Sequence, residues 1–135
     1  MIIRVDAADP EPLFAQIVAS VKRAVAAGEA QPGDRLPSVR DLALELIVNP
    51  NTVARAYQVL EAEGVTISRK GAGTAIAPRR AAAPVADRER RLREGLDALL
   101  ADAVHLGCAA DEIRDALESA LARVRFPCDT KGDGA

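Results

Sequence analysis

The chain has 135 residues, which is enough for one domain or for one small domain with an appendage. Aromatic residues make up only 2% of it, which argues against a large aromatic ligand pocket or a stacking platform for single-stranded nucleic acid. The net charge is −2, yet residues 35–80 carry seven Lys and Arg against four Asp and Glu. This locally basic segment is compatible with a module that faces DNA.

The sequence shows no sign of export or of membrane insertion. Residues 1–12 lack the features of a signal peptide, and no apolar run approaches the about 20 residues that span a bilayer. Two cysteines, Cys108 and Cys128, are too few for a disulfide framework, so we expect a cytoplasmic protein. His105 and Cys108 are three residues apart, but no second pair at ligand spacing accompanies them. We therefore expect no metal site and no cofactor.

The first predicted helix covers residues 10–27. Asp9 is a favourable N-cap and Pro10 suits the first helical position, while Gly28 is placed to follow the C-terminal end. The apolar stripe of this helix consists of Phe14, Ile17, Val21 and Val25. Residues 31–34, Gln-Pro-Gly-Asp, are typical of a turn.

Two short helices separated by a tight turn come next. Ser38 caps a helix that extends to Leu46, and Asn49 caps a helix that begins at Pro50 and is ended by Gly64. This order predicts a helix-turn-helix. The later helix has an apolar stripe of Val53, Ala56, Tyr57 and Leu60. Its opposite face carries Asn51, Arg55 and Gln58, with Thr52 at the flank.

Residues 65–69 and 74–77 predict two short strands, and the glycine-rich residues 70–73 between them suit a hairpin turn. Val65, Ile67 and Ile76 are candidates for the core. A helix, a helix-turn-helix and a hairpin follow one another in a winged helix-turn-helix. The fold class we expect is thus mainly α with a small β-hairpin.

A second helical part follows the winged domain, which we assign to residues 1–78. Residues 79–90 are rich in Ala, Pro and Arg and predict a linker, residues 91–126 predict an antiparallel helical hairpin, and residues 127–135 predict a disordered tail. A hairpin this short cannot close a core of its own, so we expect it to pair with a second copy of the chain. The apolar residues that recur at spacings of four and three are Leu92, Leu96, Leu99, Ala103, Leu106, Ile113, Leu117, Ala120 and Val124.

Three motifs carry a resemblance to a known family. They are QPGDRLPSVRDLA (31–43), VNPNTVARAYQVLEAEG (48–64) and RKGAGTAIA (69–77). Through them, residues 11–77 resemble the N-terminal DNA-binding domain of the GntR family of bacterial transcription regulators, and the short helical tail resembles that of the YtrA subfamily. The resemblance implies a homodimer that binds an inverted-repeat, palindromic operator in double-stranded DNA. We expect a repressor rather than an enzyme. An unknown small-molecule effector is a possible further partner.

The sequence departs from the family at two positions. Ile47 stands in the turn where the family usually has Gly, so that either this residue is strained or the turn has another shape. Ala75 replaces a bulky apolar residue that commonly follows the glycines of the hairpin, which predicts a lightly anchored, mobile hairpin.

The second helix of a helix-turn-helix enters the major groove. There Asn51 and Gln58 can bind adenine edges, and Arg55 can bind guanine or phosphate. The resemblance implies a DNA contact for Arg40 and places the hairpin tip at the minor groove. The predicted DNA-binding residues are Ser38, Arg40, Asn49, Asn51, Thr52, Arg55, Tyr57, Gln58, Lys70, Gly71, Gly73 and Thr74.

Each of these assignments has a simpler structural alternative. The polar helix face can be an ordinary solvated surface, and Arg40 can pair with Asp41 or Asp34. Tyr57 can be a core residue, and the hairpin glycines can serve the turn alone. For the whole chain, the alternatives are a winged-helix module that binds proteins and an architectural DNA binder without sequence preference.

Overall fold

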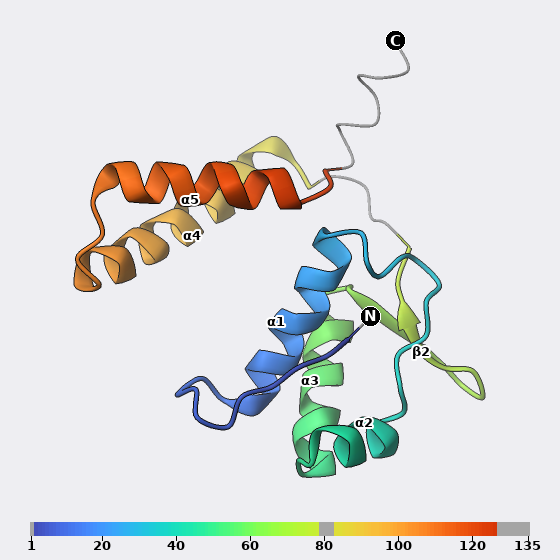
Figure 1. Ribbon diagram of the computed structural model, residues 1–135. Coiled ribbons are helices and arrows are strands. Elements are labelled where there is room, and N and C mark those ends of the chain that lie inside the picture. The colour runs from blue at the N-terminus through green and yellow to red at the C-terminus, as the bar shows by residue number, and fades with distance from the viewer. Residues whose placement is uncertain (1, 79–82, 127–135) are drawn as a thin grey trace. The chain divides into compact units, whose positions relative to one another are not determined.

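The computed structural model of the chain describes residues 2–78 and 83–126. Within them the elements are, in chain order, α1 (Leu13–Ala26), α2 (Val39–Leu46), α3 (Pro50–Ala62), β1 (Thr66–Arg69), β2 (Gly73–Ile76), α4 (Val85–His105) and α5 (Ala110–Arg123) (Figure 1). The described residues form two compact units. We call residues 2–78 the head and residues 83–124 the helical unit. In the described part of the chain, no helix is long and apolar enough to cross a membrane.

The head has a closed apolar core in which α1 and α2 pack against α3. The predicted stripe of α3 is confirmed, because Val53, Ala56, Tyr57 and Leu60 are all buried. On α1, Ile17 and Val21 are fully buried, while Phe14 and Val25 are partly buried against the same core. This packing holds α3 in place and leaves its other face exposed.

The predicted start of α1 is wrong, since the helix begins at Leu13 rather than at residue 10. Pro12 explains the difference, because the residue before a proline is disfavoured in helical geometry. Asp9 caps no helix; its Oδ1 accepts a hydrogen bond from the Glu11 amide at 2.9 Å in a local turn. The buried Gln16 side chain bonds the backbone of Asp6 and Glu11 and so holds the preceding segment in its non-helical path.

The helix-turn-helix is confirmed, including both of its caps. The Asp41 amide donates to Ser38 Oγ at 3.0 Å, and the Asn51 amide donates to Asn49 Oδ1 at 2.8 Å. Ile47 lies between the helices with φ 57° and ψ 53°, in the left-handed region. Of the two alternatives for this residue, the strained backbone conformation is therefore the one observed.

The hairpin is also confirmed, but one predicted core residue is wrong. Thr66 pairs with Ile76, and both are buried at 3% and 2% exposure. Because successive side chains of a strand point to opposite faces, Ile67 lies on the other face and is 36% exposed. Val65 precedes the strand and packs partly against the core.

A third segment pairs with β2. The backbone amides of Gly33 and Leu36 donate to the carbonyls of Ile76 and Thr74, respectively, both at 2.9 Å. The Ile76 amide donates to the backbone carbonyl of Asp34 at 2.8 Å. Residues 31–34 are thus more than the predicted turn, since their end opens a short backbone ladder. This ladder anchors β2 along the edge that β1 does not occupy.

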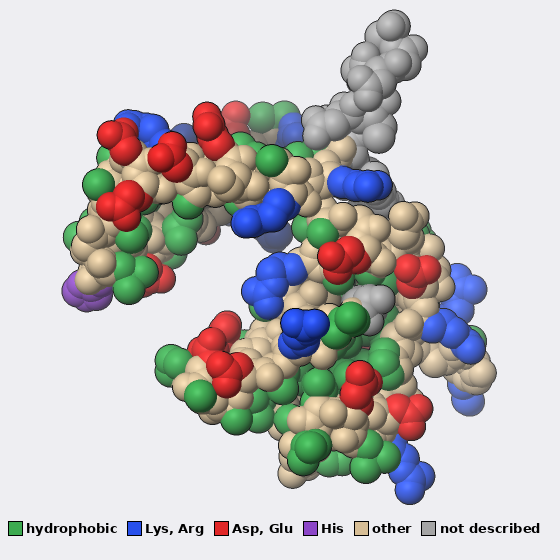
Figure 2. Space-filling model, in the orientation of Figure 1, with side chains coloured by type: hydrophobic (Ala, Val, Ile, Leu, Met, Phe, Trp, Pro, Cys, Tyr) green, Lys and Arg blue, Asp and Glu red, His purple; other side chains and the backbone are tan. Residues whose placement is uncertain are grey.

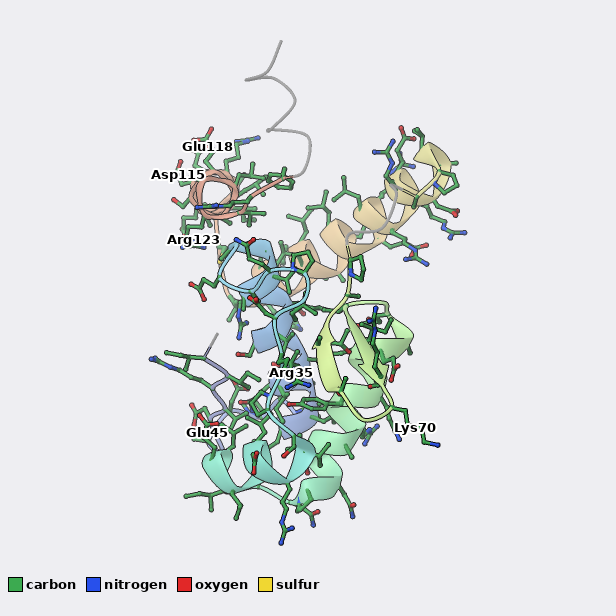
Figure 3. All side chains as sticks on the ribbon, turned by 90° about the vertical axis from the view of Figure 1, so that its right-hand side faces the viewer. Arg35, Glu45, Lys70, Asp115, Glu118 and Arg123 are labelled. Atoms are coloured by element: carbon green, nitrogen blue, oxygen red, sulfur yellow. The ribbon has the colours of Figure 1, made fainter. Side chains whose placement is uncertain are left out.

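The helical unit consists of α4 and α5, joined by a turn in which Gly107 has φ +80°. The predicted linker is too long, because α4 begins at Val85 and residues 85–90 are helical. The predicted tail, residues 127–135, and residues 79–82 of the linker lie outside the described residues. The two helices diverge from their turn, which can be followed in the view along α5 (Figure 3).

Candidate DNA interface

The exposed face of α3 carries the three side chains that we predicted to contact base edges. Asn51, Arg55 and Gln58 are all exposed, and Thr52 is half-buried at the flank. In residues 2–78 and 83–126, no ion pair or hydrogen bond engages the polar end of any of these side chains. Their amide and guanidinium groups are therefore available to a ligand outside the head.

Arg40 lies in the first turn of α2 and is exposed. The described residues include no ion pair to its guanidinium, so the predicted alternative partners Asp41 and Asp34 are not used. The Asp34 carboxylate instead accepts a hydrogen bond from the Gln31 amide at 2.8 Å. Asp41 in the same turn suits the positive end of the helix dipole, whereas the Arg40 cation does not, so an anionic ligand is favourable beside Arg40.

Ser38 and Asn49 have used their side-chain oxygens as acceptors in the two caps. The Ser38 O–H and the Asn49 NH₂ remain as donors, and both residues are exposed. They stand at the N-terminal ends of α2 and α3, where backbone N–H groups and the helix dipole also favour an anion.

Tyr57 is a core residue, exposed by only 7%. Its hydroxyl donates to the carbonyl of Pro37 at 2.7 Å, which ties α3 to the segment before α2. Burial, with a smaller contribution from the negative charge of Glu45, raises the pKa of Tyr57 to about 12. Because a tyrosine has a single O–H proton, a hydrogen bond to a phosphate would require the bond to Pro37 to break.

The hairpin tip presents Lys70 to solvent, and Figure 3 shows its side chain projecting away from the head. Gly71 and Gly73 have φ values of +82° and +77°, with open space where a Cβ would lie. The backbone conformation alone therefore requires glycine at both positions. Thr74 is half-buried, and its hydroxyl lies 3.3 Å from Ser68 Oγ.

Two shallow depressions bring most of the predicted residues together. The first is lined by Ser38, Tyr57, Gly71, Gly73 and Thr74, together with Arg35, Leu36, Val39 and Ala72. The second is lined by Asn51, Thr52 and Arg55, together with Pro12, Leu13 and Phe14. Arg40, Asn49, Gln58 and Lys70 line neither depression.

Sequence reasoning missed two residues of this surface. The Arg35 guanidinium donates to the Ala72 carbonyl at 2.6 Å and so fastens the hairpin tip to the head. Phe14 lies under Arg55, a contact that its place in the apolar stripe of α1 did not suggest. Figure 2 shows Lys and Arg side chains along the edge of the head that carries β2.

The described residues hold no group of three or more His, Cys, Asp or Glu that could bind a metal ion. What they present is a helix face with amide and guanidinium donors, two helix N-termini and a basic hairpin tip. These groups can bind phosphates and base edges.

Comparisons with known proteins agree with this geometry. The family of bacterial regulatory proteins named gntR matches residues 13–76. The HTH-type transcriptional repressor YtrA of Bacillus subtilis (strain 168) is 34% identical over 123 residues, which cover 91% of this chain and 95% of that protein.

Solved structures show the same likeness. A transcriptional antiterminator from Listeria monocytogenes EGD-e is similar with a TM-score of 0.76 and 33% identity, covering 88% of this chain and 89% of that one. YtrA from Sulfolobus acidocaldarius, a GntR-family transcription factor, is similar with a TM-score of 0.61 and 32% identity, covering 75% of this chain and 99% of that one. These relatives are transcription regulators and not enzymes. The chain therefore belongs to the gntR family of bacterial regulatory proteins and is a DNA-binding transcription regulator.

Proposed function

We propose that the chain is a repressor that binds a palindromic operator as a homodimer, with one head on each half-site. The observation that carries the proposal is the uncovered apolar surface of the helical unit. Two-fold symmetry in the protein implies two-fold symmetry in its DNA site. The repressor role rests on the likeness to the Bacillus subtilis protein of that name.

The uncovered surface has the composition of a protein interface. In the described part of the helical unit, Ala103 is the one buried hydrophobic residue. Ile113, Ala120 and Val124 are half-buried. The large side chains left exposed include five predicted for dimerisation and two that the prediction omitted: Leu92, Leu96, Leu99, Leu106 and Leu117, then Leu100 and Leu121. A monomer rarely leaves so many large apolar side chains of two neighbouring helices in water, so a second copy is the expected cover.

The proposed DNA contacts fall into two groups. Arg40, Asn51, Arg55 and Gln58 contact base edges in the major groove, since these residues are exposed and no side-chain hydrogen bond or ion pair within residues 2–78 and 83–126 occupies their donors. The remaining predicted residues position the head on the sugar-phosphate backbone. They are Ser38, Asn49, Thr52, Lys70, Gly71, Gly73 and Thr74. Tyr57, also predicted for this surface, instead supports α3 from the core through its hydrogen bond to Pro37.

Selection of bound sequences from a random DNA pool tests this function. The expected result is a palindrome with one fixed spacing between half-sites. Equal affinity for random and selected DNA would instead indicate an architectural DNA binder. Absence of DNA binding, together with a protein partner whose binding is insensitive to salt, would indicate an interaction module.

Single variants then test the two groups of contacts. Arg40→Ala and Arg55→Ala should each cost about 1–3 kcal/mol of operator binding and relax specificity at one position per half-site. Lys70→Ala should weaken all sequences alike and lower the salt dependence by about one counterion per head. If Arg40→Ala or Arg55→Ala weakened binding to all sequences equally, that arginine would be a contact to phosphate and not to a base edge.

A further inference from the structure

Arg55 is the one predicted base-contacting residue whose side chain rests on an aromatic ring. Its Cζ atom lies 3.9 Å from the centroid of the Phe14 ring, within the range of a cation–π contact. Phe14 comes from the first turns of α1 and Arg55 from α3, so the contact joins two helices of the head.

The contact leaves the hydrogen-bonding capacity of Arg55 intact. A ring face accepts the positive charge of a guanidinium without a conventional acceptor atom, and within the described residues no carboxylate pairs with Arg55. The N–H donors thus stay free while the position of the group is restricted. Phe14 is itself partly buried against the head core, so the ring is a fixed support rather than a second flexible side chain.

The surroundings of the pair point toward the DNA-facing surface. Arg55 and Phe14 line one depression together with Asn51 and Thr52, which belong to the N-terminal end of α3. In a helix-turn-helix, this end of the second helix lies nearest to the bases. A guanidinium at this place can reach the edge of a guanine.

We infer that Phe14 is a positioning residue, which holds the Arg55 guanidinium in the orientation that binds a base edge. The inference rests on the proposed function and deepens it. A long flexible arginine loses side-chain freedom when it docks on a guanine, and an arginine already held on a ring loses less. Phe14 therefore contributes to specificity at the base that Arg55 contacts without touching DNA itself.

The test is a double-mutant cycle in the full chain, with binding to the selected operator and to random DNA measured over a range of salt concentrations. Phe14→Leu, which keeps an apolar side chain but removes the ring, should weaken operator binding about two- to fivefold for each half-site. It should leave random-DNA binding and the salt dependence unchanged. Phe14→Tyr keeps a ring and should restore operator binding.

Two further measurements separate positioning from general destabilisation. In the Arg55→Ala background, Phe14→Leu should no longer affect operator binding. Val25→Ala removes a side chain that is partly buried against the same core at the other end of α1, so it should lower the melting temperature without changing operator affinity.

Three outcomes would overturn the inference. One is equal weakening of operator and random DNA by Phe14→Leu, and the second is an effect that persists in the Arg55→Ala background. The third is tighter operator binding by Phe14→Leu, which would mean that Arg55 leaves the ring in order to bind. All three leave the proposed function in place, whereas a wild-type chain that selects no palindrome would refute that function first.

Discussion

The head and the helical unit have equally regular apolar patterns but bury them to different degrees. In the head, Leu42 is 1% exposed and Leu60 is fully buried. In the helical unit, Leu92 is 65% exposed and Leu99 is 55% exposed. An apolar stripe therefore shows that a helix has a partner surface, but not whether that surface belongs to the same chain.

The number of surrounding elements explains the difference. Three helices and a sheet surround the core of the head, so the stripe of α3 is covered from several sides. The helical unit has only α4 and α5, which diverge from their turn (Figure 3). Two helices in this arrangement cannot enclose a core, which is why we assign the missing cover to a second chain.

The largest expected effect is on the head core. Leu42→Ala should lower the free energy of unfolding by about 2–5 kcal/mol, because it leaves a cavity among well-packed side chains. Leu92→Ala, measured in chain diluted until it is monomeric, should change that energy by less than about 0.5 kcal/mol. Denaturant titration measures both, and the fluorescence of Tyr57, the single tyrosine in a chain without tryptophan, reports the head. If both variants lost a similar amount of unfolding free energy, the two leucines would not differ in burial as described.

The next effect concerns association. Leu96→Glu or Leu99→Glu should make the chain monomeric in sedimentation and weaken operator binding, because each introduces an unpaired charge into the proposed interface. The stability of the head should not change. Ala101→Glu is the matched control, since Ala101 lies on the opposite face of α4 and its replacement should leave the dimer intact. A dimer that survives both leucine variants would place the interface elsewhere.

A smaller effect compares the turns of the two units. Ile47 in the head and Gly107 in the helical unit both have positive φ, at 57° and 80°. Ile47→Gly should raise the free energy of unfolding of the head by about 0.5–1 kcal/mol, because a β-branched residue is strained there. Gly107→Ala should reduce the helicity of the helical unit, since it introduces the same strain. Thermal unfolding followed by circular dichroism measures both effects. A less stable head in Ile47→Gly would show that Ile47 is not strained in its left-handed conformation.

The smallest effect is confined to alkaline pH. The folded chain holds the Tyr57 proton more tightly than the unfolded chain, whose tyrosine has the ordinary pKa of about 10. The contribution of this proton to stability should be complete below pH 10 and should disappear as the pH rises toward 12. Tyrosinate absorbance gives the pKa directly, and Tyr57→Phe should remove this part of the pH dependence. A folded-state midpoint near 10 would contradict the burial argument.

The sequence by itself determined the local features of the head. Ser38 and Asn49 were recognisable as caps, and Gly28 and Gly64 as residues that follow helix ends, because each acts on backbone groups within a few residues. The stripe of α3 followed from the helical period in the same way. The start of α1 is also a local feature, because Pro12 rather than Pro10 sets the first helical residue.

Only the tertiary structure decided the contacts between distant segments. Arg35 reaches Ala72 across 37 residues of sequence, and the residues around Arg35 form a ladder with β2 that local turn chemistry does not imply. Likewise, the pairing of Thr66 with Ile76 decided that Thr66, and not Ile67, faces the core. Phe14 lies under Arg55 only because α1 packs across α3. Local propensity is a property of neighbouring residues, whereas these contacts depend on how whole elements pack against one another.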